Sequence, residues 1–137
     1  MSIEELIKAL KELTYEHIVF FKRINELISA LNKDPFKAIE DFMFFFENSI
    51  IPHRDREEAY VFPIILKLKT EEKPLIEELI NEHKKHLNEF KHLKENLANG
   101  KLTEAKKQIE KLLNGLKKHI EQEEPLYQLL LKEALKT

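Results

Sequence analysis

The chain has 137 residues, of which 42% are hydrophobic and 35% charged, which suits one domain with a single core. The formal net charge is only −2, so neither nucleic-acid nor membrane binding is indicated, and the absence of Cys excludes disulfides, thiolate catalysis and Cys-ligated metal sites. Only two Gly are present, which argues against a turn-rich β fold and favours long helices. We therefore expect one all-α domain over residues 1–137.

The first predicted helix covers about residues 3–30. Ser2 and Glu5 form a capping box at its start, and apolar residues then recur at helical spacing along its length. Asp34 and Pro35 follow, a pair typical of an N-cap and the first residue of the next helix.

The second predicted helix covers residues 35–62 and contains a proline. Pro52 lacks the backbone N–H that a helix interior needs, so we expect a kink or an irregular turn just before His53. Pro63 lies near the end of this helix.

The third predicted helix covers residues 74–98 and ends at Asn99-Gly100, a strong C-terminal signal. Thr103 is expected to cap the fourth, and Pro125 to bend or break it before a last helical piece that reaches about residue 135. Short connections make consecutive helices antiparallel neighbours, so the sequence predicts an up-down-up-down four-helix bundle.

The two halves of the chain share a repeat that is concentrated in His and Glu residues. A constant shift of 66 positions, from 17 to 83, superposes these residues, while the halves match poorly elsewhere. The pairs are His17 with His83, His53 with His119, Glu57 with Glu123, Glu16 with Glu82, and Glu58 with Glu124.

The four repeated histidines are expected at one level of the bundle, one on each helix. Each lies roughly 15–20 residues from the turn it shares with its neighbour, and equal distances from a shared turn give equal heights in antiparallel helices. Glu57 and Glu123 follow His53 and His119 by four residues, on the same helix faces. Four imidazoles and two carboxylates should therefore converge in the core.

Such a cluster predicts a metal centre, because an unpaired buried carboxylate costs several kcal/mol and a cation offsets that cost. Six ligands exceed the four of a tetrahedral zinc site, whereas two bridging carboxylates would leave two histidines for each of two ions. Mixed imidazole and carboxylate ligands suit iron, with manganese or zinc as less favoured ions. The predicted metal ligands are His17, His53, Glu57, His83, His119 and Glu123.

These residues resemble the motifs of the hemerythrin-like, or HHE cation-binding, family over essentially the whole chain. The resemblance implies a non-haem diiron centre, oxo- or hydroxo-bridged, that binds dioxygen, senses oxygen or iron, or handles nitric oxide or peroxide. The matching stretches are Tyr-Glu-His17, His53-Arg-Asp-Arg-Glu57-Glu58, Val-Phe-Pro63, Asn-Glu-His83 and His119-Ile-Glu-Gln-Glu123-Glu124.

One departure from the family's oxygen carriers bears on function. Their helix 3 has a second His four residues after the first, where this chain has Leu87. His86 could replace it, but we expect His86 to be a partly exposed polar neighbour. The main prediction is a diiron protein that binds dioxygen or a related ligand. The alternatives are a diiron enzyme acting on peroxide, dioxygen or nitric oxide, with weak peroxidase or oxidase activity, and a helical module that binds zinc or no metal.

Two further expectations concern residues beside the ligands and the surroundings of the protein. Most of the adjacent acids, Glu16, Glu58, Glu82 and Glu124, are expected to be surface charges, and the remainder to accept hydrogen bonds from imidazole N–H groups. The tyrosines are expected to pack. No signal-peptide pattern and no apolar run of roughly 18 residues is present, which predicts a cytoplasmic protein, with any redox or signalling partner on a separate chain.

Overall fold

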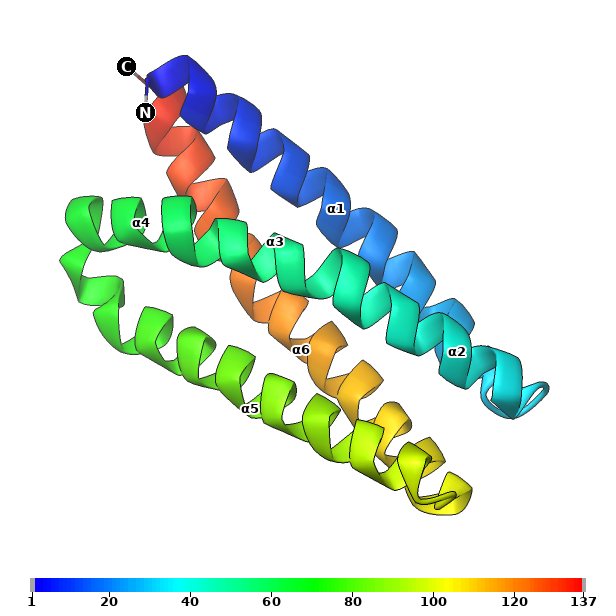
Figure 1. The fold of residues 1–137 in the computed structure, drawn as a ribbon. Helices are drawn as coiled ribbons and strands as arrows, with labels where there is room; N and C mark the ends of the chain where they lie inside the picture. Colours follow the sequence, from blue (N-terminus) through cyan, green and yellow to red (C-terminus); the bar gives the residue numbers. More distant parts are fainter. Residues whose placement is uncertain (1, 137) are drawn as a thin grey trace.

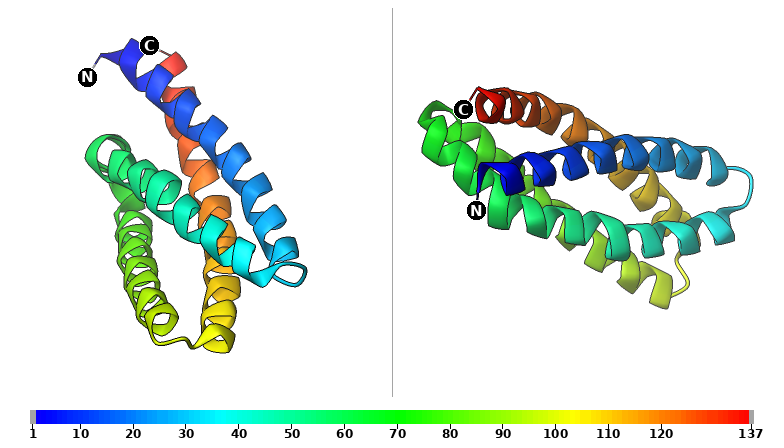
Figure 2. Two further views of the ribbon diagram at one scale, coloured as in Figure 1. Left: turned by 45° about the vertical axis from the view of Figure 1, so that its right-hand side comes forward. Right: turned by 90° about the horizontal axis from the view of Figure 1, so that it is seen from above.

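The computed structural model describes residues 2–136, and this part of the chain is all-α, without strands. Four antiparallel rods form an up-down-up-down bundle, as predicted (Figure 1). The rods are α1 (Ile3–Ala30), a composite arm over residues 35–68, α5 (Lys73–Ala98) and α6 (Leu102–Leu135). The start of α1 and the end of α6 lie side by side in Figures 1 and 2. None of the helices within residues 2–136 is long and apolar enough to cross a membrane.

The composite arm is helical throughout but contains two π-helical turns. Its elements are α2 (Pro35–Phe45), η1 (Phe46–Ile50), α3 (Ile51–Arg56), η2 (Glu57–Val61) and α4 (Phe62–Leu68). The first π turn confirms the irregularity expected before His53, and the second, before Pro63, was not predicted. A proline ring clashes with the carbonyl four residues earlier in an α-helix, and a wider π turn relieves that clash. The short α3 between the π turns carries His53.

Most helix ends follow their sequence signals, but the arm runs on to Leu68 instead of ending at about residue 62 as predicted. Ser2 caps α1 through a hydrogen bond from the backbone N–H of Glu5, and Gly100 has the positive φ of 69° that ends α5. The predicted cap at Thr103 is wrong: α6 begins one residue earlier, after Lys101, without a side-chain cap. Of the bend or break predicted at Pro125, the break is wrong, since α6 runs through this residue. A short 3₁₀ turn, η3 (Thr70–Glu72), precedes α5.

The core consists of two apolar clusters, one towards each end of the bundle. Near the α1–α2 turn, Ile24, Phe42 and Phe46 are fully or almost fully buried together with α6 leucines. At the opposite end, Leu10 and Ile76 pack in the second cluster. Along α1 the two clusters are separated at His17, so the predicted ligands lie between two layers of apolar side chains.

Candidate metal centre

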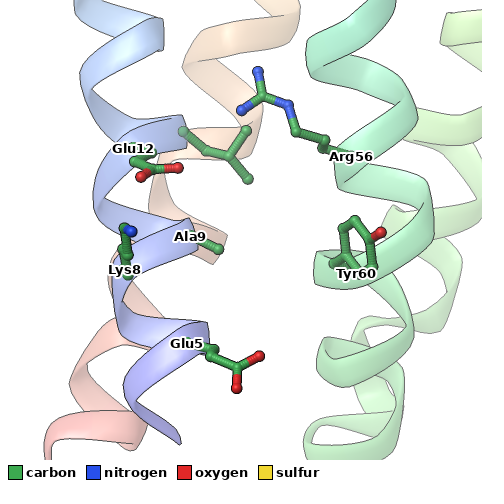
Figure 3. Close-up of a pocket in the computed structure, with 7 residues that line it drawn as sticks. Glu5, Lys8, Ala9, Glu12, Arg56 and Tyr60 are labelled. Carbon is green, nitrogen blue, oxygen red and sulfur yellow. The ribbon is translucent and has the colours of Figure 1, made fainter. Parts of the chain in front are cut away.

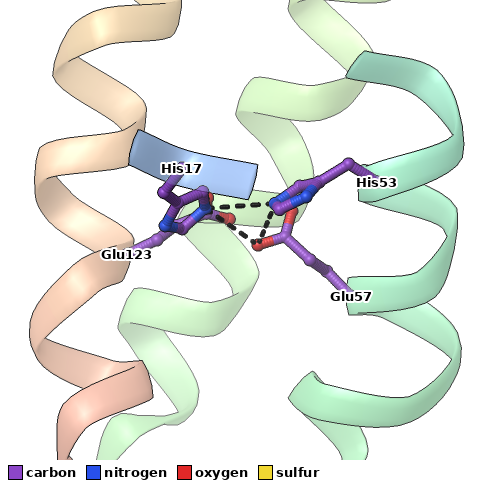
Figure 4. Close-up of side chains that lie close together, drawn as sticks. All are labelled: His17, His53, Glu57 and Glu123. Carbon is purple, nitrogen blue, oxygen red and sulfur yellow. Dashed lines mark hydrogen bonds and ion pairs between the residues drawn. The ribbon is translucent and has the colours of Figure 1, made fainter. Parts of the chain in front are cut away.

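The structure brings the six predicted ligands together in the middle of the bundle. His17 comes from α1, and His83 from α5. The arm supplies His53 and Glu57, and α6 supplies His119 and Glu123. None of the six is more than 5% exposed. The polar ends of all six side chains face one another, four of them in Figure 4.

The imidazoles form two pairs. The Nε2 atoms of His17 and His53 are 3.1 Å apart, and those of His83 and His119 are 2.9 Å apart. Metal–nitrogen bonds of about 2.1 Å at right angles place two donor atoms about 3.0 Å apart. The spacing of each pair therefore fits two neighbouring ligands of one metal ion.

Each carboxylate spans the two imidazole pairs. Glu57 places Oε2 at 3.5 Å from His53 Nε2 and Oε1 at 3.6 Å from His83 Nε2. Glu123 places Oε1 at 3.3 Å from His17 Nε2 and Oε2 at 3.0 Å from His119 Nε2. Both carboxylates thus present one oxygen to each pair, the arrangement that bridging ligands require.

The acids beside the ligands fix the orientation of every imidazole. The Nδ1 atoms lie 2.7 Å from Glu124 for His17, 2.7 Å from Glu16 for His53, 3.3 Å from Glu58 for His83 and 2.5 Å from Glu82 for His119. An ionised carboxylate can only accept, so each Nδ1–H donates and Nε2 is the ring nitrogen that faces the centre. A deprotonated Nε2 carries the lone pair that binds a metal ion, whereas in the metal-free protein Nε2–H groups donate to Glu123.

All four adjacent acids therefore contact imidazoles, and the expectation that most of them are surface charges was wrong. These four acids remain partly exposed, and in the sequence they therefore look like ordinary surface residues. Hydrogen bonds from His53 and from Arg56 outweigh the burial of Glu16 and lower its pKa to about 2. Glu16 is therefore ionised and accepts the His53 proton at any ordinary pH.

The two central carboxylates, Glu57 and Glu123, have strongly shifted pKa values that a bound cation would compensate. Burial and the neighbouring charge of Glu123 raise the pKa of Glu57 well above its usual value. Burial opposes the ionisation of Glu123 as well, but hydrogen bonds with His119, His17 and His83 lower its pKa well below the usual value. Glu57 Oε1 is one of two buried side-chain polar atoms without a hydrogen-bond partner in residues 2–136, the other being Thr14 Oγ1. Metal binding would satisfy that oxygen.

Tyr127 belongs to the site although packing had been expected for it. Its hydroxyl donates a hydrogen bond to Glu57 Oε2, its ring stacks on His17 at 4.8 Å, and it is fully buried. Tyr127 follows Glu123 by four residues on α6, a spacing that could have placed it on the same face. Tyr15 and Tyr60 are exposed and take no part.

His86 is not the partly exposed neighbour that the sequence suggested. It is 7% exposed, and its Nδ1 accepts a hydrogen bond of 2.8 Å from Arg54, itself 6% exposed. Leu87, by contrast, lies on the outer side of α5 and is 37% exposed. Sequence reasoning missed Arg54 because an arginine beside a predicted ligand is normally a surface residue.

Two surface hollows border α1, and one of them reaches a predicted ligand. A cavity of about 290 Å³ between α1 and the arm is lined by Glu5, Glu12, Arg56 and Tyr60, among others (Figure 3). A larger hollow of about 610 Å³ between α1 and α6 has His17 and Glu124 in its wall. The His17–Glu124 pair is thus the part of the site nearest to this second hollow.

Exchanging Glu82 for Gln tests whether these outer acids support the ligands. The amide keeps the size of the side chain but loses the charge that holds the His119 N–H, so metal affinity should fall about 10- to 100-fold. Titration against a competing chelator measures this change. Glu77→Gln, an exposed position on the same helix, serves as the control. Equal affinities of the two variants would show that Glu82 is only a surface charge.

A helical bundle with four imidazoles and two buried carboxylates meeting at mid-height defines a class, the metal-binding four-helix bundles. Comparison with protein-family models matches residues 8–130 to the Hemerythrin HHE cation binding domain, and the chain belongs to this family. Its domain binds metal cations, and the His and Glu clusters described above fit such a site. A search of curated proteins and a search of solved structures each gave no significant match.

Proposed function

We propose that this protein is a non-haem diiron protein that binds dioxygen or a related small ligand. The observation that supports it most directly is the pairing of the donors: His17 with His53, His83 with His119, and two carboxylates that each reach both pairs. One ion would be held by each histidine pair, with Glu57 and Glu123 as bridges. Manganese and zinc are the less favoured ions, because iron suits mixed imidazole and carboxylate ligands with open positions.

A pair of iron ions would supply one-electron redox chemistry and open positions for a small ligand. The chain supplies the surroundings. The outer acids hold each ring with its Nε2 facing inward, and the Tyr127 hydroxyl donates a hydrogen bond to Glu57 Oε2. Phe62 and the two apolar clusters keep bulk water away. A site of this kind keeps its ligands fixed while its metal changes charge.

A diiron enzyme acting on peroxide, dioxygen or nitric oxide is the second candidate, favoured by the equality of the two imidazole pairs. No third imidazole would complete the coordination of either proposed metal ion, since Leu87 lies on the outside and His86 is held by Arg54. A centre open on both ions can react with peroxide rather than release its ligand. We also propose a redox or signalling partner protein, which a sensing role would require.

Metal analysis with optical spectroscopy tests the proposal. We expect two iron ions per chain and, in the oxidised protein, an absorption spectrum that changes on addition of azide or peroxide. Zinc as the dominant metal, or no bound metal after expression with added iron, would contradict the proposal. Stopped-flow mixing of the reduced protein with oxygen then separates the candidates: an oxygenated form stable for many minutes indicates a carrier, and immediate oxidation indicates an enzyme.

A further inference from the structure

The surroundings of the two histidine pairs are nearly equivalent but differ at two places. In each half, two imidazoles face each other, and each imidazole donates to an acid on a neighbouring helix. Each half also has an aromatic ring stacked on one histidine. Tyr127 stacks on His17 with the rings 5° from parallel, and Phe62 stacks on His83 at 24°. The hydroxyl group is present on the His17 side alone.

The second difference concerns the ring that meets the other histidine of each pair edge-on. Phe20 meets His53 at 5.0 Å, and His86 meets His119 at 6.0 Å. The 66-residue shift superposes Phe20 on His86, and Arg54 on Ile120. The His17–His53 half therefore has the apolar residues Phe20 and Ile120 where the His83–His119 half has His86 and Arg54.

Arg54 is a buried cation without a carboxylate partner. It is 6% exposed, and no carboxylate oxygen of residues 2–136 lies within 4.0 Å of its guanidinium. Its hydrogen bond is to His86 Nδ1, which must be unprotonated because arginine only donates. Gly115 on α6 makes room for this histidine, since a Cβ there would lie 3.1 Å from His86 Nε2.

Buried charges in proteins are normally paired, so the isolation of Arg54 needs an explanation. Burial lowers the pKa of its guanidinium, and the charges of Glu123, Glu57, Glu82 and Glu58 oppose that effect from beyond contact distance. Two bound metal ions would neutralise the first two of these carboxylates, which act on Arg54 most strongly. The loaded centre would then leave Arg54 with still less compensation on the side of His83 and His119.

We propose that Arg54, held by His86, makes the His83–His119 half the side of the centre that binds a small inorganic anion, such as azide or hydroperoxide. The inference rests on the proposed diiron function. The anion pairs with the buried guanidinium of Arg54. The other half has apolar Phe20 and Ile120 at the corresponding positions and therefore no cation to pair with an anion. The chain thereby makes two equal histidine pairs unequal without a third imidazole.

Azide titration of the oxidised, iron-loaded protein, followed by absorption, tests the inference. Arg54→Met should weaken azide binding at least about tenfold, because a charge-assisted contact is lost. Arg54→Lys should weaken it less, since the charge remains. Arg23→Met is the matched control: it removes the same charge from a surface arginine paired with Asp41, and azide affinity should be unchanged. Iron content and thermal unfolding are measured for every variant.

A second variant covers the case in which Arg54→Met does not load iron. The double variant Arg54→Met, His86→Phe gives this half the apolar character of the Phe20 half, which the fold already accommodates, and it should show the same loss of azide binding. Affinity within threefold of the unmodified protein in an iron-loaded variant without Arg54 would overturn the inference. Failure of the unmodified protein to bind iron would instead count against the diiron function itself.

Discussion

A Glu57→Ala variant is expected to hold at most one metal ion per chain. Glu57 reaches both histidine pairs from a completely buried position, and no other side chain offers a replacement oxygen at Oε1, which lacks any partner in residues 2–136. Without this bridge each ion would keep two imidazoles and share only Glu123. Metal analysis after extensive dialysis measures the loss.

The matched control for this variant is Glu121→Ala, an exposed glutamate on α6 near the site. It should retain both ions. A Glu57→Ala protein that also retains two ions per chain would show that the carboxylate does not bridge. Circular dichroism of both variants confirms that a lost ion reflects a lost ligand rather than an unfolded chain.

Removing the metal is expected to lower the unfolding temperature by about 15–25 °C. An ion present at a hundred times its dissociation constant stabilises the folded state by about 2.7 kcal/mol, and two such ions by about 5 kcal/mol. For a chain of this size, 1 kcal/mol corresponds to about 3–5 °C. The metal-free core also keeps two buried carboxylates close together without a cation to compensate them, which is unfavourable.

Calorimetry of the loaded protein before and after chelation measures this difference. Glu57→Ala provides the comparison, since a variant that holds fewer ions should lose less on chelation. Equal unfolding temperatures with and without chelator in the unmodified protein would mean that the bundle core does not depend on a bound cation.

The sequence by itself determined the bundle and the ligand set to be tested. Helical periodicity, the cap at Ser2 and the turn at Gly100 defined four rods, and rods of similar length placed His17, His53, His83 and His119 at one height. These inferences need only local chemistry and helix geometry. The break expected at Pro125 failed because a local signal is overridden where packing holds a long helix together.

Only the tertiary structure decided what surrounds the centre. Which acid contacts which imidazole depends on the side chains of neighbouring helices, and sequence spacing within one helix does not report it. His86 and Leu87 show this most clearly: they are adjacent in the chain, yet one is buried against Arg54 and the other faces outward. The rotation of α5 about its axis, which packing against its neighbours fixes, makes that choice. The same packing buries Arg54 beside one histidine pair and places the apolar ring of Phe20 beside the other.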